Sequence, residues 1–265
     1  MSIISLKNIS FSYEEKIKNS FFLIDKLHFK IEESDIISIM GPNGSGKSTL
    51  LKIIANLLKP FSGNVLLDDV DYSLIPRNVF ARKVSFVPQS SKVFFPYSVY
   101  EIVMMGRTPH LNYFGIEKEN DHNKVNEVLE LLEIDHLKNK GINEVSGGEA
   151  QRALIARALV QEPKIMLLDE PNAHLDIKHQ VSIFNILLKL NKEFGLTVVL
   201  ISHDLNLANF FSNRVVLMNN GKIEFDSAPK EVLTEDNIKL IFNVNSKVIK
   251  SINSQENFIN ISPKL

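Results

Sequence analysis

The sequence contains no cysteine among its 265 residues. It can therefore form neither a disulfide framework nor a thiolate metal site, which fits a reducing compartment without establishing one. A strong net charge of either sign is also absent. The chain has 30 Lys and Arg residues and 31 Asp and Glu residues, which gives a net charge of −1. This balance gives no electrostatic reason to expect binding to nucleic acid.

Long hydrophobic runs are absent as well. Residues 1–7 do not combine a basic region with a following apolar run, so we expect no signal peptide. The most apolar stretches, such as residues 165–168 and 198–201, are far too short to span a bilayer. With 44% hydrophobic residues the chain can bury a core. We expect a soluble protein whose membrane role, if it has one, needs a separate partner.

Short apolar runs rich in β-branched residues alternate with helical patterns along the chain. We expect a strand at Ile36–Met40 and a helix at residues 48–58. Further strands are expected at Val84–Val87, Ile165–Leu168, Thr197–Ile201 and residues 214–218. Near-continuous apolar runs of this length suit a sheet covered on both faces. Their alternation with helices predicts an α/β fold with a mostly parallel sheet.

Three regions depart from this alternation. Residues 3–31 alternate polar and apolar side chains, which predicts a small antiparallel sheet with one wet face. Residues 90–144 are helical in pattern, with one apolar stripe formed by Val125, Val128, Leu129 and Leu132. The tail from residue 243 is rich in Asn and Ser, with short strands expected at residues 248–249 and 258–261. We therefore predict one domain over residues 1–242 and a tail over residues 243–265. Within the domain, residues 1–89 and 145–242 form the catalytic core with its β-subdomain, and residues 90–144 form an inserted helical subdomain.

A glycine-rich stretch follows the strand at Ile36–Met40 and matches the phosphate-binding loop pattern. It consists of Gly41, Pro42, Asn43, Gly44, Ser45, Gly46, Lys47 and Ser48, followed by Thr49. The glycines let the backbone turn and aim N–H groups at phosphate oxygens, and the helix that follows adds its positive dipole end. Lys47 would hold the β- and γ-phosphates of a nucleoside triphosphate, and Ser48 would bind Mg²⁺. The alternative is a glycine-rich turn without a ligand, which the strand–loop–helix context disfavours.

The strand at Ile165–Leu168 ends in two acidic residues, Asp169 and Glu170. Ligands bind at the carboxyl ends of strands in such sheets. Asp169 is suited to bind Mg²⁺ through water, and Glu170 to orient and deprotonate an attacking water. Alone, the pair could simply be a helix N-terminus at which the dipole favours acids. Its combination with Lys47 favours the catalytic interpretation.

Several further motifs stand in a fixed order along the chain. Residues 145–149 resemble the signature motif of ABC ATPases, just upstream of the Asp-Glu strand. Gln89 resembles the Q-loop residue of that family, and residues 172–176, which end in Asp176, resemble its D-loop. His203 resembles the switch histidine, and Tyr13 the aromatic residue that stacks on adenine.

The resemblance covers nearly the whole chain. It implies a P-loop NTPase (RecA-like) core with an N-terminal antiparallel β-subdomain and an inserted helical subdomain. It implies ATP as the substrate and Mg²⁺ as the cofactor, with metal ligands at Ser48, Gln89 and Asp169. The catalytic residues would be Glu170, His203 and Gln89. Two copies would pair head to tail, so that the ATP of one copy is covered by the other copy's Ser146, Gly147, Gly148 and Glu149.

The resemblance also implies partners and a location. The partners are polytopic membrane permease subunits and, indirectly, a substrate-binding protein. Binding to nucleic acid is not expected. The homodimer would sit at the cytoplasmic face of the cell membrane as a peripheral protein.

Simpler roles remain open for three of these motifs. Ser146 and the two glycines after it make an anion cradle at the start of a helix over residues 149–160, or a plain helix cap with Glu149 in the first turn. His203 stands at a strand end before Asp204, which favours a bond to the γ-phosphate over a role as a core histidine. Tyr13 either stacks on the base or packs as a half-buried strand residue.

The cargo is indicated by looser signals. Residues 106–110, Gly-Arg-Thr-Pro-His, resemble the importer branch for iron-siderophore, haem and cobalamin, and residues 174–180 and the segment after residue 232 point the same way. An ordinary helix end would explain the Gly and Pro but not the whole string. The apolar run at residues 93–97 is either core or a groove for a short helix of the membrane subunit.

The sequence therefore predicts the ATP-hydrolysing subunit of a metal-chelate importer. Alternatives are the ATPase of another transporter, a soluble assembly complex such as that for iron–sulfur clusters, and an ATP sensor without hydrolysis. Glu170, Gln89 and His203 argue against the sensor.

Overall fold

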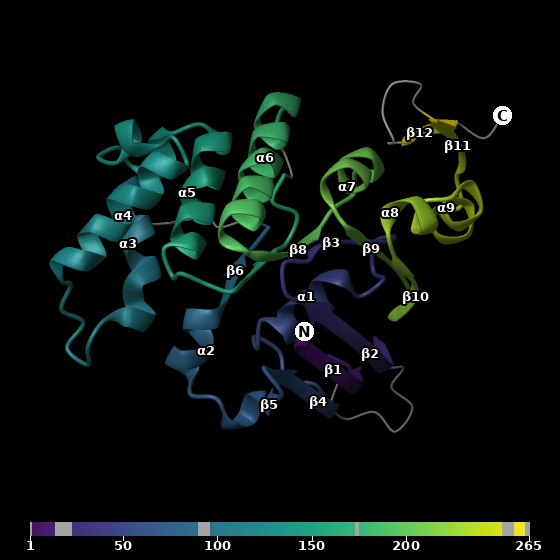
Figure 1. The fold of residues 1–265 in the computed structure, drawn as a ribbon, viewed down its shortest axis with the longest axis horizontal. Helices are drawn as coiled ribbons and strands as arrows, with labels where there is room; N and C mark the ends of the chain where they lie inside the picture. The colour runs from purple at the N-terminus through teal and green to yellow at the C-terminus, as the bar shows by residue number, and fades with distance from the viewer. Residues whose placement is uncertain (1, 14–22, 90–95, 173–174, 251–256, 263–265) are drawn as a thin grey trace. The chain divides into compact units, whose positions relative to one another are not determined.

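The computed structural model describes residues 2–13, 23–89, 96–172, 175–250 and 257–262 (Figure 1). The chain forms two compact units. The first consists of residues 1–74 and 199–265, and the second of residues 75–198. The predicted boundaries near residues 89, 144 and 242 are not tested by this division and stay predictions.

An antiparallel sheet forms much of the first unit. Its strand order is β2-β1-β4-β5, with the bounds β1 (Ser2–Phe11), β2 (Ile24–Glu32), β4 (Ser62–Leu67) and β5 (Val70–Asp71). Strand β1 pairs antiparallel with both β2 and β4. In β2 the side chains of Leu27, Phe29 and Ile31 are buried, whereas their neighbours are exposed. The antiparallel sheet with one wet face is thus confirmed.

The first unit also contains the strand that leads to the phosphate-binding loop. Strand β3 (Ile36–Met40) is buried along its whole length and pairs in parallel with β9 (Arg214–Asn219). Strand β10 (Lys222–Ser227) continues antiparallel from β9. On the other side of β3 lies β8 (Thr197–Ile201), which begins in the second unit and ends in the first. Helix α1 (Lys47–Ile54) follows the loop and ends four residues earlier than the sequence pattern predicted.

The C-terminal part of the first unit is a packed structure. Helices α7 (Leu205–Phe211), α8 (Pro229–Val232) and α9 (Glu235–Phe242) share a hydrophobic core with Met40 and Leu217. Strands β11 (Asn245–Lys250) and β12 (Asn257–Ser262) pair antiparallel, which confirms the short strands predicted in the tail. Ile259 of β12 is buried in the same core, so the tail is anchored to the unit. A short 3₁₀ helix, η1 (Tyr72–Leu74), precedes the second unit.

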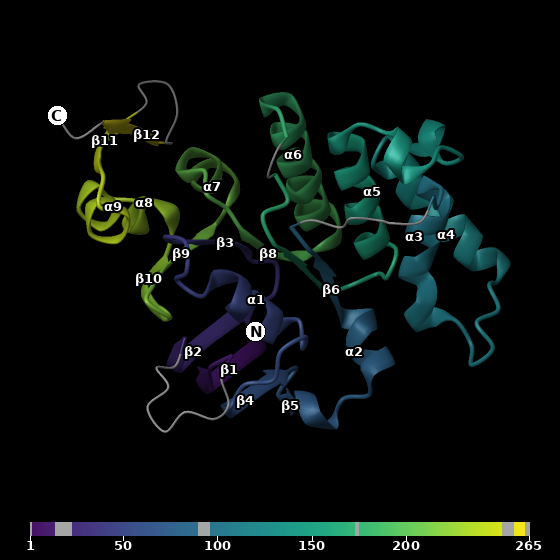
Figure 2. The ribbon, with the colours of Figure 1, turned by 180° about the vertical axis from the view of Figure 1, so that it is seen from behind.

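The second unit combines a parallel strand pair with helices. Strand β6 (Val84–Val87) pairs in parallel with β7 (Ile165–Leu168). The helices are α2 (Arg77–Lys83), α3 (Val99–Met104), η2 (Met105–His110), α4 (Glu119–Leu131), η3 (Asp135–Leu137), η4 (Ile142–Glu144), α5 (Gly147–Leu159) and α6 (Ile177–Phe194). Helices α3, α4 and α5 lie side by side, as both ribbon views show (Figures 1 and 2). The predicted helical insertion is confirmed, and the stripe of Val125, Val128, Leu129 and Leu132 is buried.

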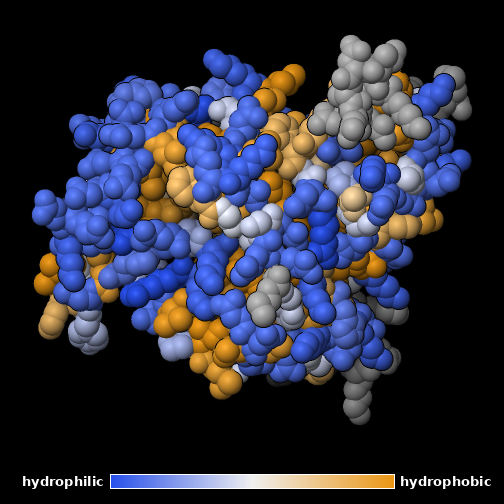
Figure 3. All heavy atoms as spheres, in the orientation of Figure 1, coloured by the Kyte–Doolittle hydropathy of each residue, from blue (hydrophilic) through white to orange (hydrophobic). Residues whose placement is uncertain are grey.

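The surface is mostly hydrophilic on the face drawn in Figure 3, with hydrophobic residues in separate patches. Large exposed hydrophobic side chains include Tyr113, Phe114 and Ile116, in the segment between η2 and α4. Among the described residues, no helix has both the length and the apolar character that a membrane span requires. The apolar run at residues 93–97 falls mostly outside the described residues.

Candidate nucleotide site

The phosphate-binding loop is held tightly against strand β9. Gly41 has a φ of +149°, and a Cβ built on it would lie 2.1 Å from the carbonyl oxygen of Met218. Any residue with a side chain would push the loop away from β9, so glycine is required at this position. Further along, the N–H of Gly221 donates to the carbonyl of Ser45 at 3.1 Å. Strand β9, the phosphate-binding loop and the turn between β9 and β10 are therefore held together by close contacts.

Polar groups converge inside this loop. Lys47 is only 6% exposed. Its Nζ donates to the carbonyl oxygens of Gly41 and Pro42, both at 2.9 Å. The buried Oγ of Ser45 has no hydrogen-bond partner within the described part of the chain. A buried ammonium and a buried hydroxyl in a glycine-rich loop form a donor set that suits phosphate oxygens.

Tyr13 lies beside the helix that follows the loop. Its hydroxyl is 3.1 Å from Oγ1 of Thr49, which is buried in the first turn of α1. The ring meets Phe11 edge to face, with centroids 4.9 Å apart, and Tyr13 is 62% exposed. An exposed ring tied to the phosphate loop is free to stack on a base. The stacking role of Tyr13 stays a prediction.

His203 follows β8 in the first unit and is exposed. The preceding residue, Ser202, donates its N–H to the carbonyl of Ile39 at 3.2 Å. Because Ile39 belongs to the strand that leads into the phosphate loop, His203 and that loop share one scaffold. Asp204 has a structural task of its own, since its Oδ1 accepts from the N–H groups of Asn206 and Leu207 at 2.9 Å and caps α7.

The acidic residues Asp169 and Glu170 follow β7, and Gln89 lies just after its parallel neighbour β6. Asp169 is buried, and its N–H donates to the carbonyl of Val87 at 2.9 Å. The next residue, Glu170, has a φ of +49°, which is unusual for a residue other than glycine. Gln89 Nε2 donates to Glu170 Oε2 at 2.6 Å. Parallel pairing of the two strands thus brings together an amide and a carboxylate that are 81 residues apart.

The signature segment is a complete helix cap. Ser146 Oγ accepts from the N–H of Glu149, and Glu149 Oε2 accepts from both the hydroxyl and the N–H of Ser146 at 2.8 Å. The hydrogen bonds from the Ser146 hydroxyl and backbone hold the pKa of Glu149 below its usual value. The cap extends α5 to Gly147, two residues before the predicted start. Cap and anion cradle are compatible, because the cap engages the N–H groups of Ser146 and Glu149, whereas a cradle would use those of Gly147 and Gly148.

The predicted residues thus fall into two groups, one in each unit. The first unit holds Tyr13, the loop from Gly41 to Thr49, and His203. The second unit holds Gln89, Asp169, Glu170, the signature residues and Asp176, which caps α6. The assembly of both groups into one site remains a prediction. His174 of the D-loop region lies outside the described residues.

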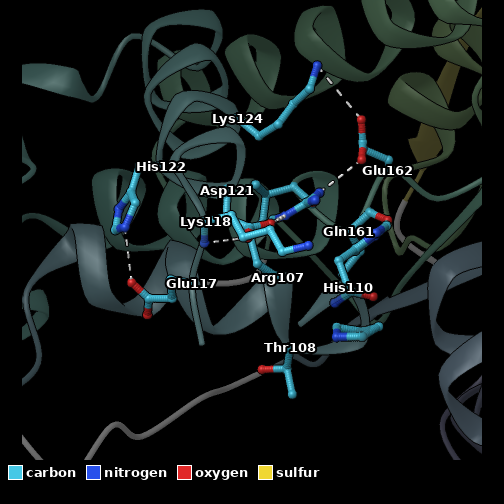
Figure 4. A network of polar contacts seen from close by, with 12 residues as sticks. Arg107, Thr108, His110, Glu117, Lys118, Asp121, His122, Lys124, Gln161 and Glu162 are labelled. Carbon is cyan, nitrogen blue, oxygen red and sulfur yellow. Dashed lines mark hydrogen bonds and ion pairs between the residues drawn. The ribbon is translucent and has the colours of Figure 1, made fainter. Parts of the chain in front are cut away.

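Figure 4 shows polar contacts of Arg107, from the Gly-Arg-Thr-Pro-His string, with Asp121 and Glu162 within the second unit. Arg107 is 3% exposed. Its Nε donates to Asp121 Oδ1 at 2.9 Å, and its Nη1 donates to the carbonyl of Val160 at 2.8 Å and to Glu162 Oε2 at 2.9 Å. A Cβ on Gly106 would lie 2.1 Å from the carbonyl of Arg157. The string therefore fastens η2 to α4 and to the end of α5.

The remaining residues of the string have partners too. His110 Nε2 is 2.9 Å from the carbonyl of Gln161, and the carbonyl of Pro109 accepts from Arg82 Nε at 2.9 Å. Thr108 Oγ1 donates to the carbonyl of Met105 at 2.6 Å. The helix-end interpretation thus extends to the whole string. The partners Asp121 and Glu162 were not predicted from the sequence. The one signal for Asp121 is its place in the first turn of α4, and Glu162, which follows α5, gives none.

Comparison with known proteins decides the family. The sequence pattern of the family described as ABC transporter matches residues 24–173. The chain belongs to the ABC transporter family. It is 33% identical, over 91% of its length and 87% of that protein, to the petrobactin import ATP-binding protein FpuC of Bacillus anthracis. The resemblance to ABC ATPases of the metal-chelate branch is confirmed.

Two solved structures of ABC proteins share the fold. One is an inward-facing conformation of a transporter described as metal-chelate type, with a TM-score of 0.85 and 29% identity over 100% of this chain and 98% of that one. The other is the dimeric ATP-binding cassette MJ0796 bound to ADP and Pi, with a TM-score of 0.74 and 32% identity over 85% and 98% of the two chains. The chain is the ATP-binding, ATP-hydrolysing subunit of an ABC transporter, with an ABC ATPase fold.

Proposed function

We propose that two copies of this chain bind two ATP molecules at a shared interface and power the uptake of a metal chelate through a separate permease. Each ATP is held by Lys47 of one copy and covered by Ser146, Gly147 and Gly148 of the other. The observation that carries the proposal is the pairing of Gln89 with Glu170 at 2.6 Å, because it places a fixed carboxylate next to an amide at the ends of two parallel strands. The dimeric cassette bound to ADP and Pi supports the shared interface.

We infer that Mg²⁺ binds to oxygen donors of this chain, which are the ligands that it prefers. The candidate ligands are the hydroxyl of Ser48, the carboxylate of Asp169 and the amide oxygen of Gln89, whose Nε2 is already used on Glu170. The described residues include no group of three His, Cys, Asp or Glu side chains that could hold a metal by themselves. One carboxylate with neutral oxygens suits Mg²⁺ that shares substrate phosphates. The ion would neutralise charge that develops on the β- and γ-phosphates.

The hydrolytic step is assigned to Glu170. Its carboxylate orients a water molecule and takes its proton as the water oxygen attacks the γ-phosphorus and the bond to ADP breaks. The Gln89 amide fixes the carboxylate before ATP arrives. His203 donates a hydrogen bond to the γ-phosphate, and Tyr13 stacks on adenine. Asp176 of the D-loop lies at the interface between the two copies.

The cargo, the partners and the location follow from the relatives. FpuC is a petrobactin import protein, and the structural neighbour is of the metal-chelate type. We assign to this chain the import of a metal chelate, such as an iron-siderophore, haem or cobalamin. The dimer binds polytopic permease subunits at the cytoplasmic face of the membrane, and a substrate-binding protein delivers the cargo to the permease. Nucleic acid has no part in this cycle.

The decisive test of the catalytic role is phosphate release by the wild-type protein and by Glu170→Gln. Loss of a general base costs about 10²- to 10⁴-fold in turnover, and the substitution keeps the size of the side chain. Turnover at the wild-type rate would show that Glu170 has another role. Ser146→Arg tests the shared site, because it should abolish dimerisation and turnover while ATP still binds to each copy.

The transport role is tested in cells. Co-purification with a polytopic membrane protein, and loss of uptake of a radiolabelled metal chelate in Lys47→Ala cells, are the expected results. An active ATPase that co-purifies with soluble assembly proteins instead would favour the iron–sulfur alternative.

A further inference from the structure

His179 stands between two motifs of the proposed site and belongs to neither. It lies in the first turn of α6, three residues after the D-loop residue Asp176. One carboxylate oxygen, Oδ1 of Asp176, accepts from the backbone N–H of His179 at 2.8 Å and from its ring Nδ1 at 2.7 Å. Because an ionised carboxylate can only accept, Nδ1 carries the proton. The backbone bond and then the ring bond lower the pKa of Asp176, so the carboxylate is ionised at neutral pH.

The same ring packs against the signature segment. A Cβ built on Gly148 would lie 2.4 Å from Cδ2, 2.7 Å from Cγ and 3.0 Å from Nε2 of His179. The imidazole therefore fills the space that a side chain at position 148 would need. Alanine at this position would have to displace the ring.

Helices α5 and α6 are joined at further points. Arg152 Nη2 donates to Ser182 Oγ at 2.8 Å, one turn beyond the contact between Gly148 and His179. On the other side, Leu175 Cδ2 lies 3.8 Å from where a Cβ on Gly147 would be. Both ribbon views show the two helices side by side (Figures 1 and 2). The first turns of α5 and α6 are thus fixed to each other, with His179 at the point nearest to both motifs.

We propose that His179 is a positioning residue that links the D-loop carboxylate of Asp176 to the signature segment at Gly148. The two motifs then keep a fixed position relative to each other where they contact the partner copy. This inference rests on the proposed function, in which the N–H groups of that segment contact the γ-phosphate held by the other copy. The ring sets where the Gly148 backbone lies, and the bond to Asp176 sets where the ring lies. A misplacement of about 1 Å in such a site can cost roughly 100-fold in rate.

Two substitutions separate the two contacts of the ring. His179→Asn keeps an N–H donor near the position of Nδ1 but removes the ring from Gly148. His179→Phe keeps a planar ring against Gly148 but removes the donor to Asp176. Lys178→Ala is the matched control, since Lys178 is the exposed neighbour on the same turn. The measurements are steady-state ATP hydrolysis, binding of trinitrophenyl-ATP to the monomer, and ATP-dependent dimerisation in the Glu170→Gln background by analytical ultracentrifugation.

The expected result is a split between binding and turnover. Both His179 variants should lower kcat and weaken the ATP-dependent dimer by about tenfold or more. Their monomers should bind trinitrophenyl-ATP as the wild type does, because the Lys47 loop is untouched. Lys178→Ala should match the wild type in all three measurements. Thermal unfolding by circular dichroism checks that the variants are folded, and a variant with a merely structural defect would lose stability without this split.

A double-substitution cycle tests the packing directly. Gly148→Ala alone forces the ring away and should nearly abolish dimerisation. In the His179→Ala background the same change should cost less, because the space is already empty. Equal costs in both backgrounds, or wild-type kcat and dimerisation in the His179 variants, would overturn the inference and leave the proposed function standing. An inactive wild-type protein would overturn both.

Discussion

Replacement of Arg107 by methionine should destabilise the second unit by about 3 kcal/mol. Methionine keeps most of the apolar stem and removes the guanidinium from a site in which Arg107 is 3% exposed. The side chain of Asp121 is 7% exposed and would lose its partner at 2.9 Å. Breaking a buried pair from one side costs about 3 to 5 kcal/mol. We take the lower end because Asp121 keeps a hydrogen bond from the N–H of Lys118 at 3.0 Å.

Two further variants separate the causes of this loss. Arg107→Met combined with Asp121→Asn removes the stranded charge and should recover more than half of the stability. Glu162→Gln removes the charge that pairs with Arg107 and, at 3.8 Å, with Lys124. Because the acid is 48% exposed, this should cost under about 1 kcal/mol.

Urea unfolding followed by circular dichroism measures the stability of the three variants. Hydrogen exchange of peptides over residues 105–110 and 157–162 localises the loss to this contact. A loss in Arg107→Met no larger than that in Glu162→Gln would refute the assignment of a stabilising role to the buried pair.

Three other predictions concern acid, the phosphate loop and the tail. Burial acts to raise the pKa of Asp121, but hydrogen bonds from the Lys118 backbone and from Arg107 outweigh it and lower the pKa. The resulting stability is present above the unfolded pKa of about 4 and is lost as the pH falls through the folded value. The destabilisation caused by Arg107→Met should therefore be largest near neutral pH and shrink as the pH falls below about 4, as urea unfolding at a series of pH values would show. Gly41→Ala should abolish ATP binding and lower the melting temperature more than Gly44→Ala, because only the former Cβ meets the carbonyl of Met218 at 2.1 Å. Asn206→Ala removes both side-chain bonds to Ile259, at 3.1 and 2.8 Å, and should speed hydrogen exchange in β12 at a cost of about 1 to 2 kcal/mol.

The sequence pattern located four buried strands to the residue and the fifth to within one. Strands β3, β6, β7 and β8 begin and end as predicted, and β9 continues one residue further, to Asn219, because strands covered on both faces are rich in apolar side chains. Helix ends were less accurate. Helix α5 begins at Gly147, two residues before the predicted start. The low helix propensity of glycine had argued against including Gly147 and Gly148, but the cap formed by Ser146 and Glu149 holds both in the helix.

Contacts between distant segments could not be predicted in the same way. The bond between Gln89 and Glu170 depends on the register of β6 against β7, in which Val87 pairs with Leu168. Nothing in an apolar run specifies which residues of two parallel strands are paired. The position of His179 against Gly148 depends likewise on how α5 packs on α6. The residues of a site can therefore be predicted from sequence motifs, whereas the contacts that orient them depend on how distant segments pack.

The Gly-Arg-Thr-Pro-His string shows how a resemblance can be carried by structural residues. It pointed to the importer branch, yet its side chains contact α4, the end of α5 and the carbonyls beside it, all within the second unit. Arg107 uses its guanidinium on a buried acid and a carbonyl at once, which lysine could not reproduce. A branch of a family can keep such a string because it fixes the geometry of the helical region. The contacts give the string a structural role within the second unit that does not depend on the cargo.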